Sequence, residues 1–178
     1  VSGPQVVEGL HGVPFAQPLK RLQETVDIVR QAFAGEKILY DGRHHSLPLA
    51  GGQGKSLRLS QPANEQIPIW LATLGPQSLT YTGKSADGWA GTCFTPSGRA
   101  ATIGHVQKGA LEAGRDPASI DYQAGGALQF GDDLDSLITP RKNGVAFTLG
   151  AMGSATSNFY NDAYSRGGFA DEAKHIQQ

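Results

Sequence analysis

The chain has 178 residues, of which 39% are hydrophobic, and its formal net charge is −1. This length and composition suit one globular domain or part of one, and they exclude wholesale disorder. The near-neutral charge without a basic stripe argues against a nucleic-acid partner, and no apolar run reaches the ~18 residues of a membrane span.

The cysteine count bears on the cellular compartment, and the glycine count is unusually high. Cys93 is the single cysteine, so no internal disulfide can form, which fits a reducing, cytoplasmic location. Glycine accounts for 24 residues, about twice its usual share of ~7%. The first residue is Val1 rather than Met, and the last residues indicate a helix without a stop signal. We therefore expect a piece of a longer chain.

The N-terminal third is predicted to form a loop, a helix and a hairpin. A glycine-rich loop over residues 2–15, which can include a short helical turn around residues 5–9, precedes a helix over residues 18–35. That helix has apolar residues at spacings of three and four. Asp41 and Gly42 separate two short apolar-containing runs within residues 37–47. An Asp-Gly pair in that position predicts a β-hairpin that turns at these two residues.

A strand, a turn and a helix follow. The apolar run over residues 67–71 predicts a fully buried parallel strand. The chain then turns at Gly75, and Pro76 can occupy the first position of a helix. The next two backbone N–H groups lie at the helix N-terminus, where free donors and the helix dipole attract an anion. Residues 86–92 indicate the next strand, which completes a βαβ unit.

The remaining elements alternate in the same way. They are a helix capped by Ser97 with Ile103, Val106, Ala110 and Leu111 on its inner face, a strand over residues 120–130, a helix capped by Asp132-Asp133, and a helical stretch over residues 157–178 broken at Gly167-Gly168. Strands that alternate with helices predict an α/β fold with a parallel sheet.

Three further motifs suggest chemistry that we reject. His44 and His45 are adjacent on a predicted strand, so their side chains point to opposite faces and do not share a metal ion. Residues 54–56 (Gly-Lys-Ser) resemble the end of a phosphate-binding P-loop, but the glycine required five residues earlier is Leu49. Cys93 has no evident paired base, which favours a small buried residue over a nucleophile.

Several short motifs share an order and spacing that is more specific than any one of them. They are Ser2-Gly3-Pro4, His11-Gly12-Val13-Pro14-Phe15, Ile67-Pro68-Ile69, Leu74-Gly75-Pro76, Ala86-Asp87-Gly88-Trp89, Asn158-Phe159-Tyr160-Asn161 and Arg166-x-Gly168. Together they resemble the luciferase-like monooxygenase superfamily, and within it the branch that uses the deazaflavin coenzyme F-420.

This resemblance implies that residues 1–178 are one domain, a partial TIM (β/α)8 barrel. Val1 ends strand 4, and residues 67–72, 88–92 and 120–130 form strands 5, 6 and 7. Residues 37–61 are an insertion before strand 5.

The resemblance also implies a cofactor site. The phosphate of F-420, or of FMN as the alternative, is expected on the turn after strand 5, the deazaflavin ring beside Ser2 and Gly3, and the substrate near His11. The expected cofactor-binding residues are Ser2, Gly3, Thr73, Leu74, Gly75, Pro76, Gln77 and Ser78, with a bond from the Ser78 hydroxyl. No metal site is expected, and no catalytic residue is assigned.

The implied activity is hydride transfer between the deazaflavin and a small organic substrate. An FMN-dependent monooxygenase or reductase, a non-catalytic barrel fragment and a phosphate-binding barrel without flavin are the alternatives. Relatives that oxidise a sugar phosphate have glutamate where this chain has Pro4, which argues against that substrate. A homodimer is compatible with the resemblance, and the 178-residue chain alone is expected to be inactive.

Overall fold

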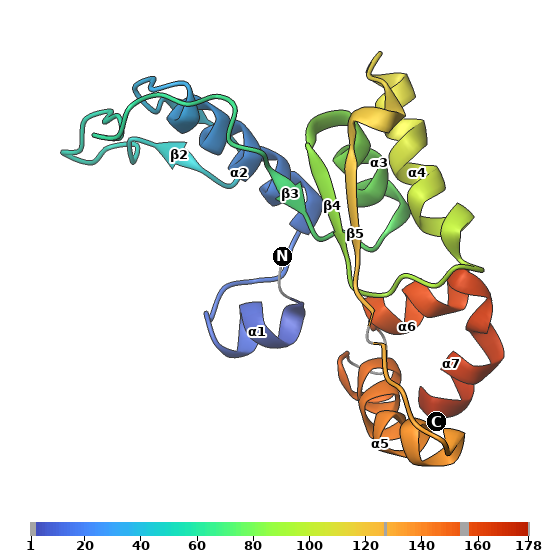
Figure 1. Cartoon of the computed structure of the whole chain (residues 1–178). Coiled ribbons are helices and arrows are strands. Elements are labelled where there is room, and N and C mark those ends of the chain that lie inside the picture. The colour runs from blue at the N-terminus through green and yellow to red at the C-terminus, as the bar shows by residue number, and fades with distance from the viewer. Residues whose placement is uncertain (1–2, 127, 154–156, 178) are drawn as a thin grey trace. The chain divides into compact units, whose positions relative to one another are not determined.

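The computed structural model describes residues 3–126, 128–153 and 157–177, which form two compact units (Figure 1). One unit comprises residues 15–69, and the other comprises residues 3–14 and 70–177. The expected sites at Val1 and Ser2 lie outside the described residues. Within the described ranges, no helix has the length and apolar character needed to cross a membrane.

The first unit contains the predicted helix and hairpin. Helix α2 (Pro18–Phe33) starts with proline in its first turn, and Gly35 follows it with a positive φ of 71°. Strands β1 (Tyr40–Asp41) and β2 (Ser46–Leu47) pair in the antiparallel direction. Both predicted elements are therefore confirmed.

The hairpin turn differs from the prediction. Asp41 pairs with Ser46, so the loop spans residues 42–45 and the Asp-Gly pair is not the turn. The buried Glu24 carboxylate accepts hydrogen bonds from the backbone N–H groups of Arg43, His44 and His45 at 2.9, 2.8 and 3.0 Å. Burial alone raises a carboxyl pKa, but these donors hold the pKa of Glu24 below its ordinary value. A helix side chain thus shapes this loop.

The second unit is built on a three-stranded parallel sheet with the order β3-β4-β5 (Figure 1). The strands are β3 (Trp70–Leu71), β4 (Gly88–Gly91) and β5 (Asp121–Ala124). The three predicted strands and the α/β class are confirmed, although β3 and β5 are shorter than expected. Only two residues of β3 pair with β4, and β5 ends where Gly125 and Gly126 begin.

Two helices pack on the sheet: α3 (Pro76–Ser85) and α4 (Arg99–Glu112). The buried core that joins them to the sheet consists of Leu79, Trp89, Val106, Ala110 and Ile120. Two details of the α4 prediction are wrong. Gly98 occupies the N-cap position without a side-chain cap, and Leu111 is 66% exposed because it lies on the outer face.

The sheet is covered on one face by these helices, so the expectation of a fully buried first strand is wrong for this chain. Leu71 is buried, whereas Trp70 is 39% exposed. In β5, Tyr122 packs against the core, but its neighbours on the strand are exposed. A sheet that helices cover on one face leaves residues of its other face exposed.

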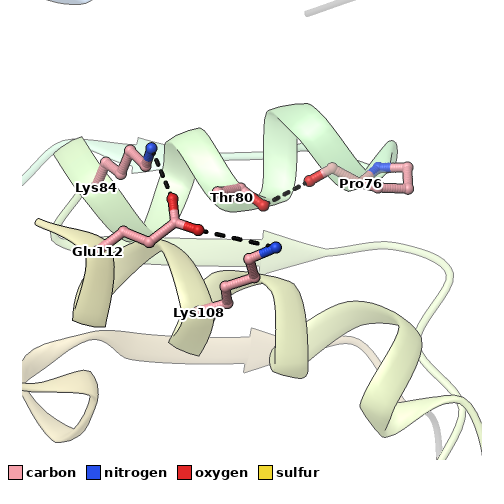
Figure 2. A network of polar contacts seen from close by, with 5 residues as sticks. All are labelled: Pro76, Thr80, Lys84, Lys108 and Glu112. Carbon is pink, nitrogen blue, oxygen red and sulfur yellow. Dashed lines mark hydrogen bonds and ion pairs between the residues drawn. The ribbon is translucent and has the colours of Figure 1, made fainter.

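Helices α3 and α4 approach each other through glycines. A Cβ on Gly83 would overlap the carbonyl oxygen of Val106, and a Cβ on Gly109 would overlap that of Thr80. At the edge of this contact, Glu112 forms ion pairs with Lys84 at 2.8 Å and Lys108 at 3.8 Å (Figure 2). The hydrogen bond from Lys84 is the largest influence on Glu112 and lowers its pKa.

Helical elements make up most of the rest of the second unit (Figure 1). They are α1 (Pro4–Gly9), the 3-10 turn η1 (Pro117–Ser119), α5 (Leu134–Ala146), the π-helical turn η2 (Phe147–Ala151), α6 (Phe159–Tyr164), the π-helical turn η3 (Ser165–Phe169) and α7 (Ala170–Gln177). Asp133 caps α5 as predicted. The predicted break at Gly167-Gly168 is confirmed by a φ of 101° at Gly168.

Buried asparagines hold the C-terminal elements together. The Asn158 side chain caps α6 and donates to the Leu149 carbonyl at 2.9 Å. The Asn161 amide donates to the same carbonyl at 2.9 Å and to that of Ala173 at 2.7 Å. The Asn-Phe-Tyr-Asn motif therefore has a structural basis, because its two amides satisfy backbone groups of η2 and α7.

Candidate functional site

The turn between β3 and α3 has the geometry that the sequence predicts. Gly75 is the N-cap residue of α3, in an extended conformation, and Pro76 begins the helix. No side chain caps this end, and the first helical hydrogen bond runs from the Leu79 N–H to the Gly75 carbonyl at 2.8 Å. The backbone N–H groups of Gln77 and Ser78 therefore remain available to an anion.

Side chains hold three consecutive carbonyl groups of this turn. Trp89 Nε1 donates to the Thr73 oxygen at 2.9 Å, Arg166 Nη2 to the Leu74 oxygen at 3.0 Å, and Ser78 Oγ to the Gly75 oxygen at 2.9 Å. The Trp89 indole is fully buried. With three adjacent peptide groups fixed, the turn is a defined structure rather than a free loop.

The hydroxyl groups of two buried threonines also stabilise this turn. Thr73 Oγ1 lies 2.7 Å from Thr82 Oγ1, and Thr82 Oγ1 donates to the Ser78 carbonyl at 3.0 Å. Both threonines are buried. Because the single Thr82 proton goes to Ser78, Thr73 is the donor of the pair. These bonds tie the end of β3 to the first turns of α3.

The role expected for the Ser78 hydroxyl differs in the structure. Its proton is donated to the Gly75 carbonyl, so it is not free to reach an anion. The backbone N–H groups are therefore the donors that this end of α3 offers.

The loop after β4 and the turn η3 meet beside this site. Ser97 Oγ lies 3.5 Å from the Gly167 carbonyl oxygen, and a Cβ on Gly98 would lie 2.8 Å from Gly167 Cα. Ser97 precedes the N-cap residue Gly98 by one position and does not cap α4. Turn η3 thus contacts the loop after β3 through Arg166 and the loop after β4 through Gly167.

Cys93, two residues after β4, is buried as predicted. Its side chain is buried, and burial raises the pKa of the thiol. The pKa of the neighbouring Tyr164 is also raised, first by burial and then by Cys93. A protonated thiol is a poor nucleophile.

The other expected site residues lie elsewhere in the second unit. Gly3 is the N-cap residue of α1, and the exposed His11 follows that helix. In the ranges that the structure describes, no hydrogen bond joins either residue to the turn after β3. Among the same residues, no group of three or more His, Cys, Asp or Glu side chains could hold a metal ion.

Sequence reasoning missed one site residue and one contact. Arg166 belongs to a recognised motif, but nothing local indicates that it reaches Leu74. Trp89 is a fully buried core residue, and its indole N–H also holds the turn.

Comparison with known proteins identifies the family. The model of the luciferase-like monooxygenase family matches residues 1–178. The chain belongs to this family. It is 34% identical to a predicted coenzyme F-420-dependent oxidoreductase of Mycobacterium tuberculosis, over 99% of this chain and 53% of that protein.

Two reductases extend the comparison. The 5,10-methylenetetrahydromethanopterin reductase of Methanolobus tindarius is 26% identical over 83% of this chain and 43% of its own length. The solved coenzyme F-420-dependent tetrahydromethanopterin reductase of Methanopyrus kandleri shares the fold, with a TM-score of 0.66 at 23% identity. That match covers 84% of this chain and 46% of the reductase. The chain spans about half the length of the curated relatives it matches.

Proposed function

We propose that the protein binds coenzyme F-420 and supports hydride transfer between its deazaflavin ring and a small organic substrate. The observation that carries this proposal is the uncapped N-terminus of α3 at the carboxyl end of β3, in a chain of the luciferase-like family. The relatives named for F-420 dependence favour this coenzyme over FMN. A cytoplasmic location and a homodimer stay predictions.

We also propose that β3, β4 and β5 correspond to strands 5, 6 and 7 of a TIM barrel. Their parallel order, with a helix after each of the first two, supports this assignment. Ligands of TIM barrels bind at the carboxyl ends of the strands, which is where the turn lies. Turnover by the 178-residue chain alone would contradict the need for further strands.

The turn fits an anionic group. An ideal Cβ at Gly75 finds no atom nearer than Ser78 Oγ at 3.6 Å, and the φ of −81° is open to any residue. The fold therefore does not require glycine here, and the space beside Gly75 is free for a phosphate oxygen. The N–H groups of Gln77 and Ser78 are the proposed donors.

The coenzyme, when bound, supplies the carbon that accepts or donates the hydride. The contribution of the turn is to hold the phosphate and so orient the ring. Gly3 and Ser2 are proposed to flank the ring, and His11 to face the substrate. Pro4 stands where relatives that oxidise a sugar phosphate have glutamate, so we expect a different substrate class.

Titration of the full-length protein with F-420 and with FMN, followed by fluorescence, tests the proposal. We expect F-420 to bind and FMN to bind weakly. Gly75→Val should fold normally, but the valine side chain would occupy the space proposed for the phosphate oxygen. We expect F-420 binding to weaken by about 10- to 100-fold, because each lost hydrogen bond to a charged group is worth about 1.5–3 kcal/mol.

Gly54→Val is the matched control, since Gly54 also lies in a loop with only a distant contact, at 3.9 Å. It should leave the affinity unchanged. Unchanged affinity in Gly75→Val would refute the assigned turn. Binding of FMN in place of F-420 would reassign the coenzyme, and binding of neither would refute the function.

A further inference from the structure

Arg166 connects the proposed phosphate turn to a segment 92 residues later in the chain. Its Nη2 donates to the Leu74 carbonyl oxygen at 3.0 Å, and the next residue, Gly167, contacts the loop after β4. Arg166 lies in turn η3, two residues before the left-handed kink at Gly168 that this turn contains.

The hydrogen bond to Leu74 sets the direction of one peptide group. In a trans peptide the C=O and the N–H point in opposite directions, so a fixed Leu74 carbonyl also fixes the Gly75 N–H. The Trp89 bond to the Thr73 carbonyl orients the Leu74 N–H in the same way. Neither N–H has a hydrogen-bond partner within the described residues.

The guanidinium keeps its charge beside the turn. Arg166 is exposed and forms no ion pair with any residue in the described ranges. One of its five N–H donors is used by Leu74. The guanidinium therefore holds the turn without being neutralised.

We propose that Arg166 is a positioning residue for the coenzyme phosphate. It holds the Leu74–Gly75 peptide so that the turn presents its N–H groups as one rigid set. This inference rests on the proposed function, and it adds a residue from outside the βαβ unit to the cofactor site.

The test compares two ligands: F-420 and the deazaflavin riboside that has the same ring without the phosphate. In the full-length protein, Arg166→Ala should weaken F-420 binding by about tenfold and change riboside binding by less than about twofold. A general loss of structure would weaken both ligands alike, so the difference between them identifies a role at the phosphate.

Arg115→Ala is the matched control. Arg115 Nη1 also donates to a backbone carbonyl, that of Gly83, at 2.8 Å, but Gly83 lies near the other end of α3. This variant should keep the wild-type affinity for both ligands. Circular dichroism at the titration temperature confirms that each variant is folded.

The outcomes separate the two proposals. If the wild-type protein binds F-420 and the riboside equally, the proposed phosphate turn is wrong. If the wild type prefers F-420 and Arg166→Ala keeps that preference, only the role of Arg166 is wrong. Equal weakening of both ligands in Arg166→Ala would also overturn it.

Discussion

Replacement of Gly83 by alanine should destabilise the protein, although alanine is the better helix former. The new Cβ would overlap the Val106 carbonyl oxygen and lie 2.8 Å from the Ala110 nitrogen, where ordinary contacts begin at 3.4 Å. Both are backbone atoms, so no side-chain rotation relieves the overlap. Helix α3 must therefore move away from α4 by more than half an ångström.

The expected magnitude follows from two opposing terms. Overpacking of a close contact costs about 1–3 kcal/mol, and backbone partners place Gly83 at the upper end. The gain in helix propensity is about 1 kcal/mol. We expect a net loss of about 2 kcal/mol in the free energy of unfolding, or about 1 M in the urea midpoint.

Gly104→Ala provides the matched control in the facing helix. Gly104 lies within α4, and a Cβ there would meet no atom within 4 Å. This variant should gain about 1 kcal/mol, so the two alanines should act in opposite directions. Urea denaturation of the full-length protein measures both. Equal midpoints for the two variants would refute the packing argument.

Three further changes test other contacts. Trp89→Phe leaves the buried Thr73 carbonyl without its donor, and urea denaturation should show a loss of about 2 kcal/mol; an unchanged midpoint would contradict this. Asn161→Leu should speed hydrogen exchange in residues 170–177 relative to α4, because the Ala173 carbonyl loses its donor; equal protection would argue against it. Because the folded pKa of Glu24 is depressed, its stabilisation is present above the ordinary pKa of 4.5 and is lost as acid protonates it. Glu24→Gln should lower the melting temperature near pH 7 and flatten its fall below pH 4.5, and an unaltered pH profile would exclude this role.

Local sequence patterns were sufficient to predict the elements whose structure depends on one continuous segment. The apolar run, Gly75 and Pro76 predicted a strand, a turn and a helix, because short apolar runs and proline-initiated helices have local signatures. The same holds for α2 and for the cap at Asp133. The α/β class followed from the alternation of such segments.

The features that could not be predicted depend on contacts between residues far apart in the sequence. The hairpin loop is shaped by Glu24, about 20 residues earlier, rather than by Asp-Gly. Ser97 contacts Gly167 across 70 residues, a contact that its local sequence does not indicate, and Gly98 takes the N-cap position instead. The same separation hides Arg166 from any local rule, because a side chain can donate to whichever carbonyl the tertiary fold brings near it.

The hydrogen bond from Arg166 to Leu74, which spans 92 residues of sequence, has a consequence for the order of folding. Strands β3 and β4 with helix α3 are complete by Gly91, whereas Arg166 leaves the ribosome 75 residues later. Contacts between distant parts of a chain form late, because a large loop must close first. We expect the βαβ unit to exist for a time with the Leu74 carbonyl unheld. On the proposed role of Arg166, the turn then reaches its rigid form only after this distant contact has closed.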